Sequence, residues 1–269
     1  MIIGQYNAIS WIQMWAEKGF PHFVVLIAPK GCGKRTLAKY IAEKLNASYA
    51  ECGIKVDEVR EVIDTAYKVR DLVVFCIADA DTMRSEAKNA MLKITEEPPE
   101  NAYFVLTVQD DSTLLDTIKS RSVQLILEPY IPSQLEEYCE LKGWLDPATK
   151  EMCSMVSNPY ELETLRGYGQ EFIDYVELVL DNIAEVEPSN AFKSSSKLAL
   201  KADSEEGYDL GVFFSVFIYF CEKRLEQDPL RYAQGMYVTE PFLSRVNRLG
   251  VNKQQLYDSW VFGIREVWL

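Results

Sequence analysis

The sequence is poor in the residues from which many metal and catalytic sites are built. Its single histidine, His22, excludes any constellation that needs two histidines. None of its six cysteines stands at the C-x₂₋₄-C spacing of a zinc site from another. We therefore predict no metal site. Because we find no secretion signal, we also expect free and mostly buried thiols rather than disulfides.

Long hydrophobic runs are missing as well. The longest uncharged apolar run, residues 212–221, is about half of the ~20 residues that a membrane span needs. The N-terminus has no basic start, and Glu17 and Lys18 interrupt its apolar stretch, so it does not resemble a signal peptide. We expect a soluble, cytoplasmic protein without membrane contacts.

Positive charge is scarce. Lys and Arg number 28 against 41 Asp and Glu, which gives a formal net charge of −13. A protein that binds nucleic acid on its own usually carries a basic face, because the release of counterions from the phosphates drives that binding. The charge argues against autonomous nucleic-acid binding. The alternative is that the acidity serves solubility alone.

The apolar residues that are present show two different patterns. With 269 residues, 48% of them hydrophobic, the chain can bury a real core and form one to three domains. In the first half, short apolar runs alternate with helical patterns, as in a parallel sheet buried on both faces. The expected strands are 23–28, 72–78, 102–108, 123–127 and, more weakly, 48–52, and the expected helices are 34–45, 56–69 and 85–97.

The second half contains helical patterns and no convincing strand from Pro132 onward. Residues 187–189 and 193–197 interrupt these patterns and are typical of loops. Residues 210–225 are apolar nearly all round, which predicts the central helix of a bundle.

A glycine-containing segment, APKGCGKRT at 28–36, follows the first expected strand directly. Glycines let backbone N–H groups converge on a phosphate, and the helix that follows adds its positive N-terminus. In the standard pattern G-x-x-x-x-G-K-[ST], the lysine reaches the β- and γ-phosphates and the final hydroxyl holds Mg²⁺. The segment therefore predicts a phosphate loop, made of Gly31, Cys32, Gly33, Lys34, Arg35 and Thr36.

Two positions of this loop depart from the pattern. Ala28 replaces the first glycine, and Arg35 stands at the hydroxyl position. Thr36 comes one residue later, about 100° further round the helix, so it does not substitute for that hydroxyl. Phosphate contacts can survive these changes, but normal metal coordination cannot.

ATP hydrolysis in such folds also needs acidic residues at the tip of another strand. Here the run 72–78 ends in Asp79-Ala80-Asp81, which makes Asp79 the candidate. The alternative for both aspartates is that they are solvated acids at a strand end.

Several further segments resemble one known family. Residues 89–99, NAMLKITEEPP, are close to N-A-L-L-K-x-L-E-E-P-P, and residues 114–122, LLDTIKSRS, are similar to L-L-P-T-I-x-S-R-C. With Gly4-Gln5, Phe20-Pro21-His22 and the loop, they stand in the order found in bacterial clamp-loader subunits, which are AAA+ proteins. The resemblance covers most of residues 1–122, and residues 251–256 are similar, more weakly, to the C-terminal collar helix of this family.

The resemblance implies a fold and its division. We expect an α/β AAA+ domain with a parallel five-stranded sheet and helices on both faces at 1–127. A small helical lid at 128–168 and an all-α collar for oligomerisation at 169–269 would follow. Many relatives insert a four-cysteine zinc module, for which the chain has no room between Cys52 and Val56, so we expect no zinc.

The resemblance also sets the register of the acidic strand tip. Active members have D-E eleven and ten residues before the asparagine of N-A-L-L-K, and these positions are Ala78 and Asp79 here. A slip of one residue would make Asp79 the metal ligand and Ala80 the missing glutamate. Either register loses one acid. Together with Arg35, this predicts that ATP or ADP, if bound, is not turned over by this chain.

The lid offers a further departure. Relatives that hydrolyse ATP place a basic residue there, near a G-S or G-N turn, whereas the comparable stretch 157–161 here offers an acid, Glu161. This again argues against turnover.

Ser120-Arg121-Ser122 carries the sharpest functional hypothesis. In clamp loaders this element projects its arginine into the ATP site of the neighbouring subunit, where a guanidinium stabilises the charge on the γ-phosphoryl oxygens. The resemblance thus makes Arg121 a finger acting in trans, with Ser120 beside it. The alternative is that Arg121 pairs with a carboxylate at its own sheet edge.

A damaged nucleotide site combined with an intact finger resembles the delta-prime branch of the family more than its gamma/tau motor branch. The implied function is that of a largely non-hydrolysing subunit of the DNA polymerase III clamp loader. The implied partners are gamma/tau-type motor subunits, a delta-type subunit, the sliding clamp and, through the complex, primed DNA. An active motor ATPase using Lys34, Arg35 and Asp79, a pure scaffold, and a stand-alone DNA-binding protein remain as alternatives.

Overall fold

The computed structural model describes residues 2–184, 197–198, 207–247 and 250–269. The chain divides into two compact units, Met1–Pro129 and Tyr130–Leu269. The loops predicted at 187–189 and 193–197 lie outside the described residues, apart from Lys197. The predicted boundary at 127/128 lies close to the division between the units, and the separation of a lid from a collar within the second unit stays a prediction.

The first unit is built on a five-stranded parallel sheet in the order β2-β3-β4-β1-β5. Its strands are β1 (Phe23–Ile27), β2 (Ser48–Cys52), β3 (Val73–Ile77), β4 (Ala102–Val108) and β5 (Val123–Ile126). All five predicted strands, including the weak one at 48–52, are confirmed. Neighbouring residues such as Phe104 and Val105 are both buried, as expected for strands covered on both faces.

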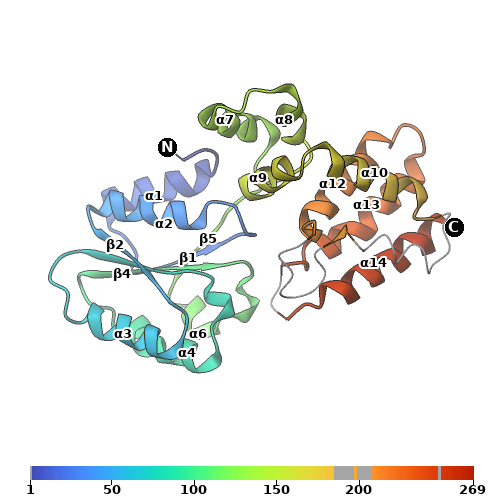
Figure 1. The fold of residues 1–269 in the computed structure, drawn as a ribbon. Coiled ribbons are helices and arrows are strands. Elements are labelled where there is room, and N and C mark those ends of the chain that lie inside the picture. Colours follow the sequence, from blue (N-terminus) through green and yellow to red (C-terminus); the bar gives the residue numbers. More distant parts are fainter. Residues whose placement is uncertain (1, 185–196, 199–206, 248–249) are drawn as a thin grey trace. The chain divides into compact units, whose positions relative to one another are not determined.

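Helices cover both faces of this sheet. Figure 1 shows α1 (Tyr6–Lys18) and α2 (Lys34–Leu45) on one face. The other face is covered by α3 (Val56–Ala66), α4 (Ser85–Ala90), α5 (Leu92–Glu96) and α6 (Asp116–Lys119). The core beneath the second group is centred on Phe104, whose ring stacks on Phe23 at 4.6 Å and on Phe75 at 5.5 Å between centroids.

The single helix predicted at 85–97 is not continuous in the structure. Residues 85–97 form two short helices, α4 and α5, separated by a turn at Met91. Met91 N donates to Lys88 O, only three residues back, at 3.2 Å. This tighter turn buries the Met91 side chain completely in the core.

The second unit is helical in the part that the structure describes. It contains α7 (Pro132–Lys142), α8 (Pro147–Met152), α9 (Pro159–Tyr168), α10 (Gln170–Asn182), α12 (Leu210–Lys223), α13 (Pro229–Leu243) and α14 (Lys253–Trp268). Its only strand-like pairing among these residues is an isolated bridge between Leu198 and Tyr208. The starts of α8, α9 and α13 combine an Asp or Asn cap with proline at the first helical position, where the missing N–H costs nothing.

Helix α12 is the central helix of this unit, as its sequence predicts. It packs against α13, α10 and α9. Phe213 and Phe217 on α12 both contact the fully buried Trp260 of α14, at 5.3 and 4.9 Å between ring centroids. None of the helices in the described ranges has the length and hydrophobicity to cross a membrane.

Candidate functional site

The carboxyl ends of the parallel strands meet at one edge of the sheet, and a cavity of about 730 Å³ opens there. Of the six predicted loop residues, five line this cavity, and Asp79 lines it as well. Cys32 is the exception, because its side chain is buried in the protein. The structure therefore brings the predicted loop and the predicted acidic strand tip together.

Two glycines give the loop its shape. Gly31 and Gly33 have φ of 91° and 82°. In this left-handed conformation, any residue with a side chain would be strained. Gly33 precedes the first residue of α2, and its carbonyl accepts the N–H of Leu37 at 2.9 Å. The turn thus delivers Lys34 and Arg35 to the first turn of α2, at the rim of the cavity.

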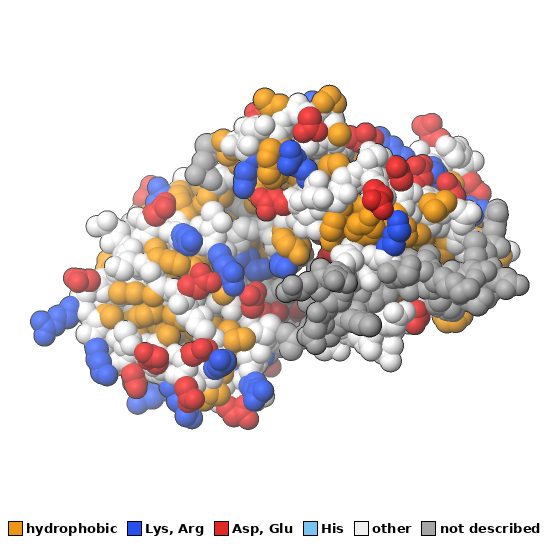
Figure 2. All heavy atoms as spheres, in the orientation of Figure 1, with side chains coloured by type: hydrophobic (Ala, Val, Ile, Leu, Met, Phe, Trp, Pro, Cys, Tyr) orange, Lys and Arg blue, Asp and Glu red, His pale blue; other side chains and the backbone are white. Residues whose placement is uncertain are grey.

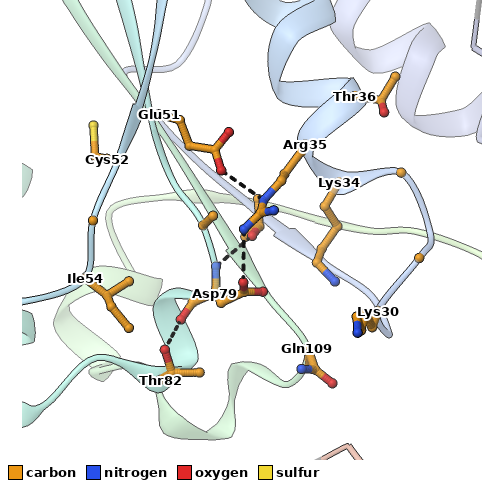
Figure 3. Close-up of a pocket in the computed structure, with 15 residues that line it drawn as sticks. Lys30, Lys34, Arg35, Thr36, Glu51, Cys52, Ile54, Asp79, Thr82 and Gln109 are labelled. Atoms are coloured by element: carbon orange, nitrogen blue, oxygen red, sulfur yellow. Dashed lines mark hydrogen bonds and ion pairs between the residues drawn. The ribbon is translucent and has the colours of Figure 1, made fainter. Parts of the chain in front are cut away.

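Lys34 lies across its own loop (Figure 3). Its Nζ donates to Ala28 O at 2.5 Å and to Pro29 O at 2.8 Å, and the residue is 7% exposed. This burial lowers the pKa of Lys34, and the nearby Cys32 and Asp79 partly oppose the effect. Two of the three donors of the ammonium are therefore used within the loop, which leaves one for a phosphate.

Arg35 lies between two carboxylates (Figure 3). Its Nε is 3.2 Å from Oε1 of Glu51 on β2, and its Nη2 is 3.3 Å from Oδ2 of Asp79, which follows β3. Glu51 was not singled out from the sequence, because its place beside Arg35 depends on β2 pairing with β3 in the sheet.

A phosphate loop in this fold implies Mg²⁺, and the residues present do not fit that ion. Magnesium is held by oxygen ligands, whereas the guanidinium at position 35 offers only donors and carries a positive charge. The carboxylate that could serve as a ligand, Asp79, is paired with that guanidinium. Among the described residues, no group of three or more His, Cys, Asp or Glu side chains is placed to hold a metal.

Asp79 is held firmly in place. Its backbone is left-handed, with φ of 54°, its N–H donates to Thr107 Oγ1 at 3.0 Å, and its carbonyl accepts the hydroxyl of Thr82 at 2.7 Å. Ala78 also lines the cavity, whereas Ala80 is buried in the core. Asp79 lines the cavity in either register of the acidic pair.

Asp81 is not a solvated acid. It is half-buried, and its Oδ2 accepts the N–H of Gln109 at 3.2 Å. Burial raises the pKa of Asp81, although the hydrogen bond from Gln109 works against this. Its contact with the residue that follows β4 gives it a structural role.

Arg121 lies elsewhere on the first unit, and neither it nor Ser120 lines the cavity. Its Nη2 is 3.2 Å from Oε1 of Glu96, and its Nη1 donates to Thr117 O at 3.2 Å. Ser120 Oγ also donates to Thr117 O, at 3.1 Å. The carboxylate partner that the alternative hypothesis requires is thus present, at the end of α5.

Glu161 is used inside the second unit. Its Oε2 accepts the N–H of Ser157 at 3.1 Å and the hydroxyl of Ser215, on α12, at 3.3 Å. Its own N–H donates to Oδ1 of Asn158, the cap of α9, at 3.0 Å. Burial raises the pKa of Glu161, and these hydrogen bonds partly offset the rise.

A parallel sheet in this order, with a phosphate loop after β1 and an acid after β3, defines an AAA+ fold. The RuvB Holliday junction branch migration motor of Thermotoga maritima has a similar fold, with a TM-score of 0.50 and 18% identity. That match covers 84% of this chain and 77% of RuvB. The predicted fold class is confirmed.

Sequence comparisons find similarity to DNA polymerase III subunits. A family model described as "DNA polymerase III, delta subunit" matches residues 48–130. The DNA polymerase III subunit delta' of Pseudomonas aeruginosa is 30% identical over 148 residues, which cover 42% of this chain and 45% of that protein. The subunit gamma/tau of Mycobacterium tuberculosis is 25% identical over 180 residues, 53% of this chain and 31% of that protein. The chain is thus similar to DNA polymerase III subunits of the clamp-loader type, and its matches span less than half the length of these relatives.

Proposed function

We propose that this chain is a largely non-hydrolysing, delta-prime-type subunit of a DNA polymerase III clamp loader. In this role it donates Arg121 to the ATP site of a neighbouring motor subunit while the sliding clamp is loaded onto primed DNA. The observation that carries the proposal is the contrast between its two arginines. Arg35 is committed to the chain's own cavity, whereas Arg121 lies at the surface away from it.

The residues of the phosphate loop support the proposal that this chain does not hydrolyse ATP. Hydrolysis needs a metal that bridges the phosphates and a group that orients the attacking water. The hydroxyl that would hold the metal is replaced by Arg35, and of the two acidic positions only Asp79 keeps a carboxylate. Nucleotide bound here would therefore remain ATP or ADP.

The exposure of Arg121 supports its role in trans. Its side chain is 39% exposed and that of Glu96 is 57% exposed. An ion pair this open to solvent stabilises a protein by about 0–1 kcal/mol. The phosphates of a neighbour's ATP carry more negative charge than one carboxylate, so they can replace Glu96 as the partner of the guanidinium.

The partners follow from the family and from the charge. Gamma/tau-type motor subunits, a delta-type subunit and the sliding clamp are proteins, which suits a chain with a net charge of −13. On the face drawn in Figure 2, acidic and basic side chains are interspersed over the first unit rather than gathered into a basic patch. Primed DNA is then reached through the complex.

The pure scaffold is the second candidate, and the Arg121–Glu96 ion pair is the observation that favours it. In that case Arg121 stabilises the end of α5 in its own subunit and contacts no nucleotide. In this scaffold neither the phosphate loop nor Arg121 would take part in ATP hydrolysis.

Both candidates are tested by the DNA- and clamp-stimulated ATPase activity of a reconstituted complex. We compare the wild type with Arg121→Ala, Arg121→Lys and Lys34→Ala in this subunit. We expect Arg121→Ala to lower activity strongly, since finger arginines supply on the order of 10³-fold or more at one site, diluted here by the other sites. Lysine lacks the planar fork and restores little. An equal loss for Lys34→Ala means that the chain's own loop is active, and no loss for any variant means that the scaffold is right.

A further inference from the structure

The cavity beside α2 contains a cation that belongs to the protein itself. We propose that the Arg35 guanidinium takes the position of a divalent metal in this loop, and that Glu51 and Asp79 become a divalent-metal site when Arg35 is replaced by serine. The inference concerns the chain's own loop and does not depend on the role of Arg121, so the two proposals fail separately.

The placement of the two carboxylates carries this inference. Glu51 lies on β2 and Asp79 follows β3, and the two strands are neighbours in register, with Cys52 opposite Ile77. The carboxylates therefore come from adjacent strand ends. Each contacts a different nitrogen of Arg35, Nε for Glu51 and Nη2 for Asp79, at 3.2 and 3.3 Å. The guanidinium thus stands between two negative charges, as a bound cation would.

The backbone positions that carry the two carboxylates do not depend on Arg35. The backbone of Asp79 is fixed because its N–H donates to Thr107 Oγ1 and its carbonyl accepts the hydroxyl of Thr82. The backbone of Glu51 is fixed by the pairing of β2 with β3. Without the guanidinium, the negative charges of Glu51 and Asp79 would repel each other across the cavity. A bound cation would reduce that repulsion.

The chemistry of position 35 decides which cation is held. Arginine has five N–H donors, no acceptor and a permanent charge, so it satisfies both carboxylates and repels a metal ion. Serine at this position restores the hydroxyl of the standard loop pattern. The variant then has two carboxylates and one hydroxyl as oxygen donors that line the cavity. Hard divalent cations accept such a set and keep water at their other positions.

The test is a Mn²⁺ titration of the full chain, in which the electron paramagnetic resonance signal reports free Mn²⁺. The proteins are the wild type, Arg35→Ser, Arg35→Ser with Asp79→Asn, and Lys30→Ser. Lys30→Ser is the matched control, because it removes the same charge from a residue that lines the same cavity. We expect Arg35→Ser to bind Mn²⁺ at least about tenfold more tightly than the wild type, because it frees the two carboxylates that the guanidinium contacts.

The added Asp79→Asn substitution should remove this gain, and Lys30→Ser should behave like the wild type. The proposal is overturned if the wild type binds Mn²⁺ as tightly as Arg35→Ser, or if Arg35→Ser gains no more than Lys30→Ser. It is also overturned if the gain survives Asp79→Asn. Arg35→Lys keeps a charge at this position and should match the wild type, and thermal unfolding verifies that each variant is folded.

Discussion

Arg121 and Glu96 form an ion pair of 3.2 Å between Nη2 and Oε1 on the surface of the sheet unit. Each residue comes from a segment that resembles the clamp-loader family, Arg121 from LLDTIKSRS and Glu96 from NAMLKITEEPP. Two motifs that are separate in the sequence thus meet at one place in the fold. The guanidinium is held there by one carboxylate and by the carbonyl of Thr117.

Arg121→Ala should leave the fold intact. Both side chains of the ion pair are solvent-exposed, so we expect the free energy of unfolding to fall by about 1 kcal/mol or less. Urea denaturation of the isolated chain measures this change. A loss above about 2 kcal/mol would instead assign Arg121 a structural role.

Glu96→Gln should preserve the ATPase activity of the reconstituted complex within a few fold. If the neighbour's phosphates replace this carboxylate, its charge is dispensable once the subunits meet. Glu97→Gln is the matched control, since it removes the adjacent charge while Glu96, the ion-pair partner of Arg121, stays unchanged. A loss for Glu96→Gln as large as that for Arg121→Ala, with Glu97→Gln unaffected, would contradict this expectation and show that Glu96 must hold the guanidinium.

Glu161 should make the second unit less stable as the pH rises through its titration. Burial raises the pKa of this carboxyl in the folded chain, so the folded state binds its proton more tightly than the unfolded state does. The protonated carboxyl contributes its full share to the free energy of unfolding below the ordinary glutamate pKa. This contribution is lost as the pH rises through the raised pKa. Glu161→Gln lacks the charge and should gain stability relative to the wild type over that range.

The control for this experiment is Glu161→Ala. It leaves the N–H of Ser157 without its acceptor and should be less stable than Glu161→Gln by about 1–3 kcal/mol at every pH, because neither variant titrates at this position. Thermal unfolding from acid to neutral pH compares the three proteins. A constant difference between Glu161→Gln and the wild type would show that Glu161 titrates normally.

Two helical glycines of the second unit should respond to alanine in opposite directions. A Cβ at Gly235 would lie 2.6 Å from a ring carbon of Trp268 and 3.2 Å from Cys221 Sγ. Gly235→Ala therefore pushes α13 and α14 apart and should lower stability. A Cβ at Gly167 meets nothing within 4 Å. Gly167→Ala should therefore stabilise α9 by about 0.5–1 kcal/mol, the usual gain from glycine to alanine within a helix. Chemical denaturation of both variants measures the contrast, and equal effects would mean that the close approach at Gly235 is relieved at no cost.

The regular elements of the sheet unit could be predicted because each is encoded locally. The helix at Lys34–Leu45 and the strand at Ser48–Cys52 have the predicted bounds, since their hydrophobic patterns and flanking residues suffice. The turn at Met91 could not be predicted, because helix-forming residues surround it and the tighter turn depends on how its side chain packs in the core.

The loop of the candidate site was predictable from its spacing, but the partners of its side chains were not. Glu51 faces Arg35 only because β2 lies beside β3, and the sequence of the weak strand β2 does not reveal its neighbour. Glu96 likewise meets Arg121 only through the packing of α5 near α6. The chemistry of a position can be inferred from local sequence, whereas its electrostatic environment requires the fold.

The thiols of the folded chain should react slowly with a disulfide reagent such as DTNB. Five of the six cysteines are buried, and Cys52 is half-buried. Burial raises the pKa of Cys52, Cys153 and Cys221 to about 12, so that almost none of each is the reactive thiolate near neutral pH. We expect all six thiols to react rapidly only after denaturation. A thiol that reacts in the native chain at the rate of free cysteine would contradict this burial, and substituting Cys52, the most exposed, would show whether it is the source.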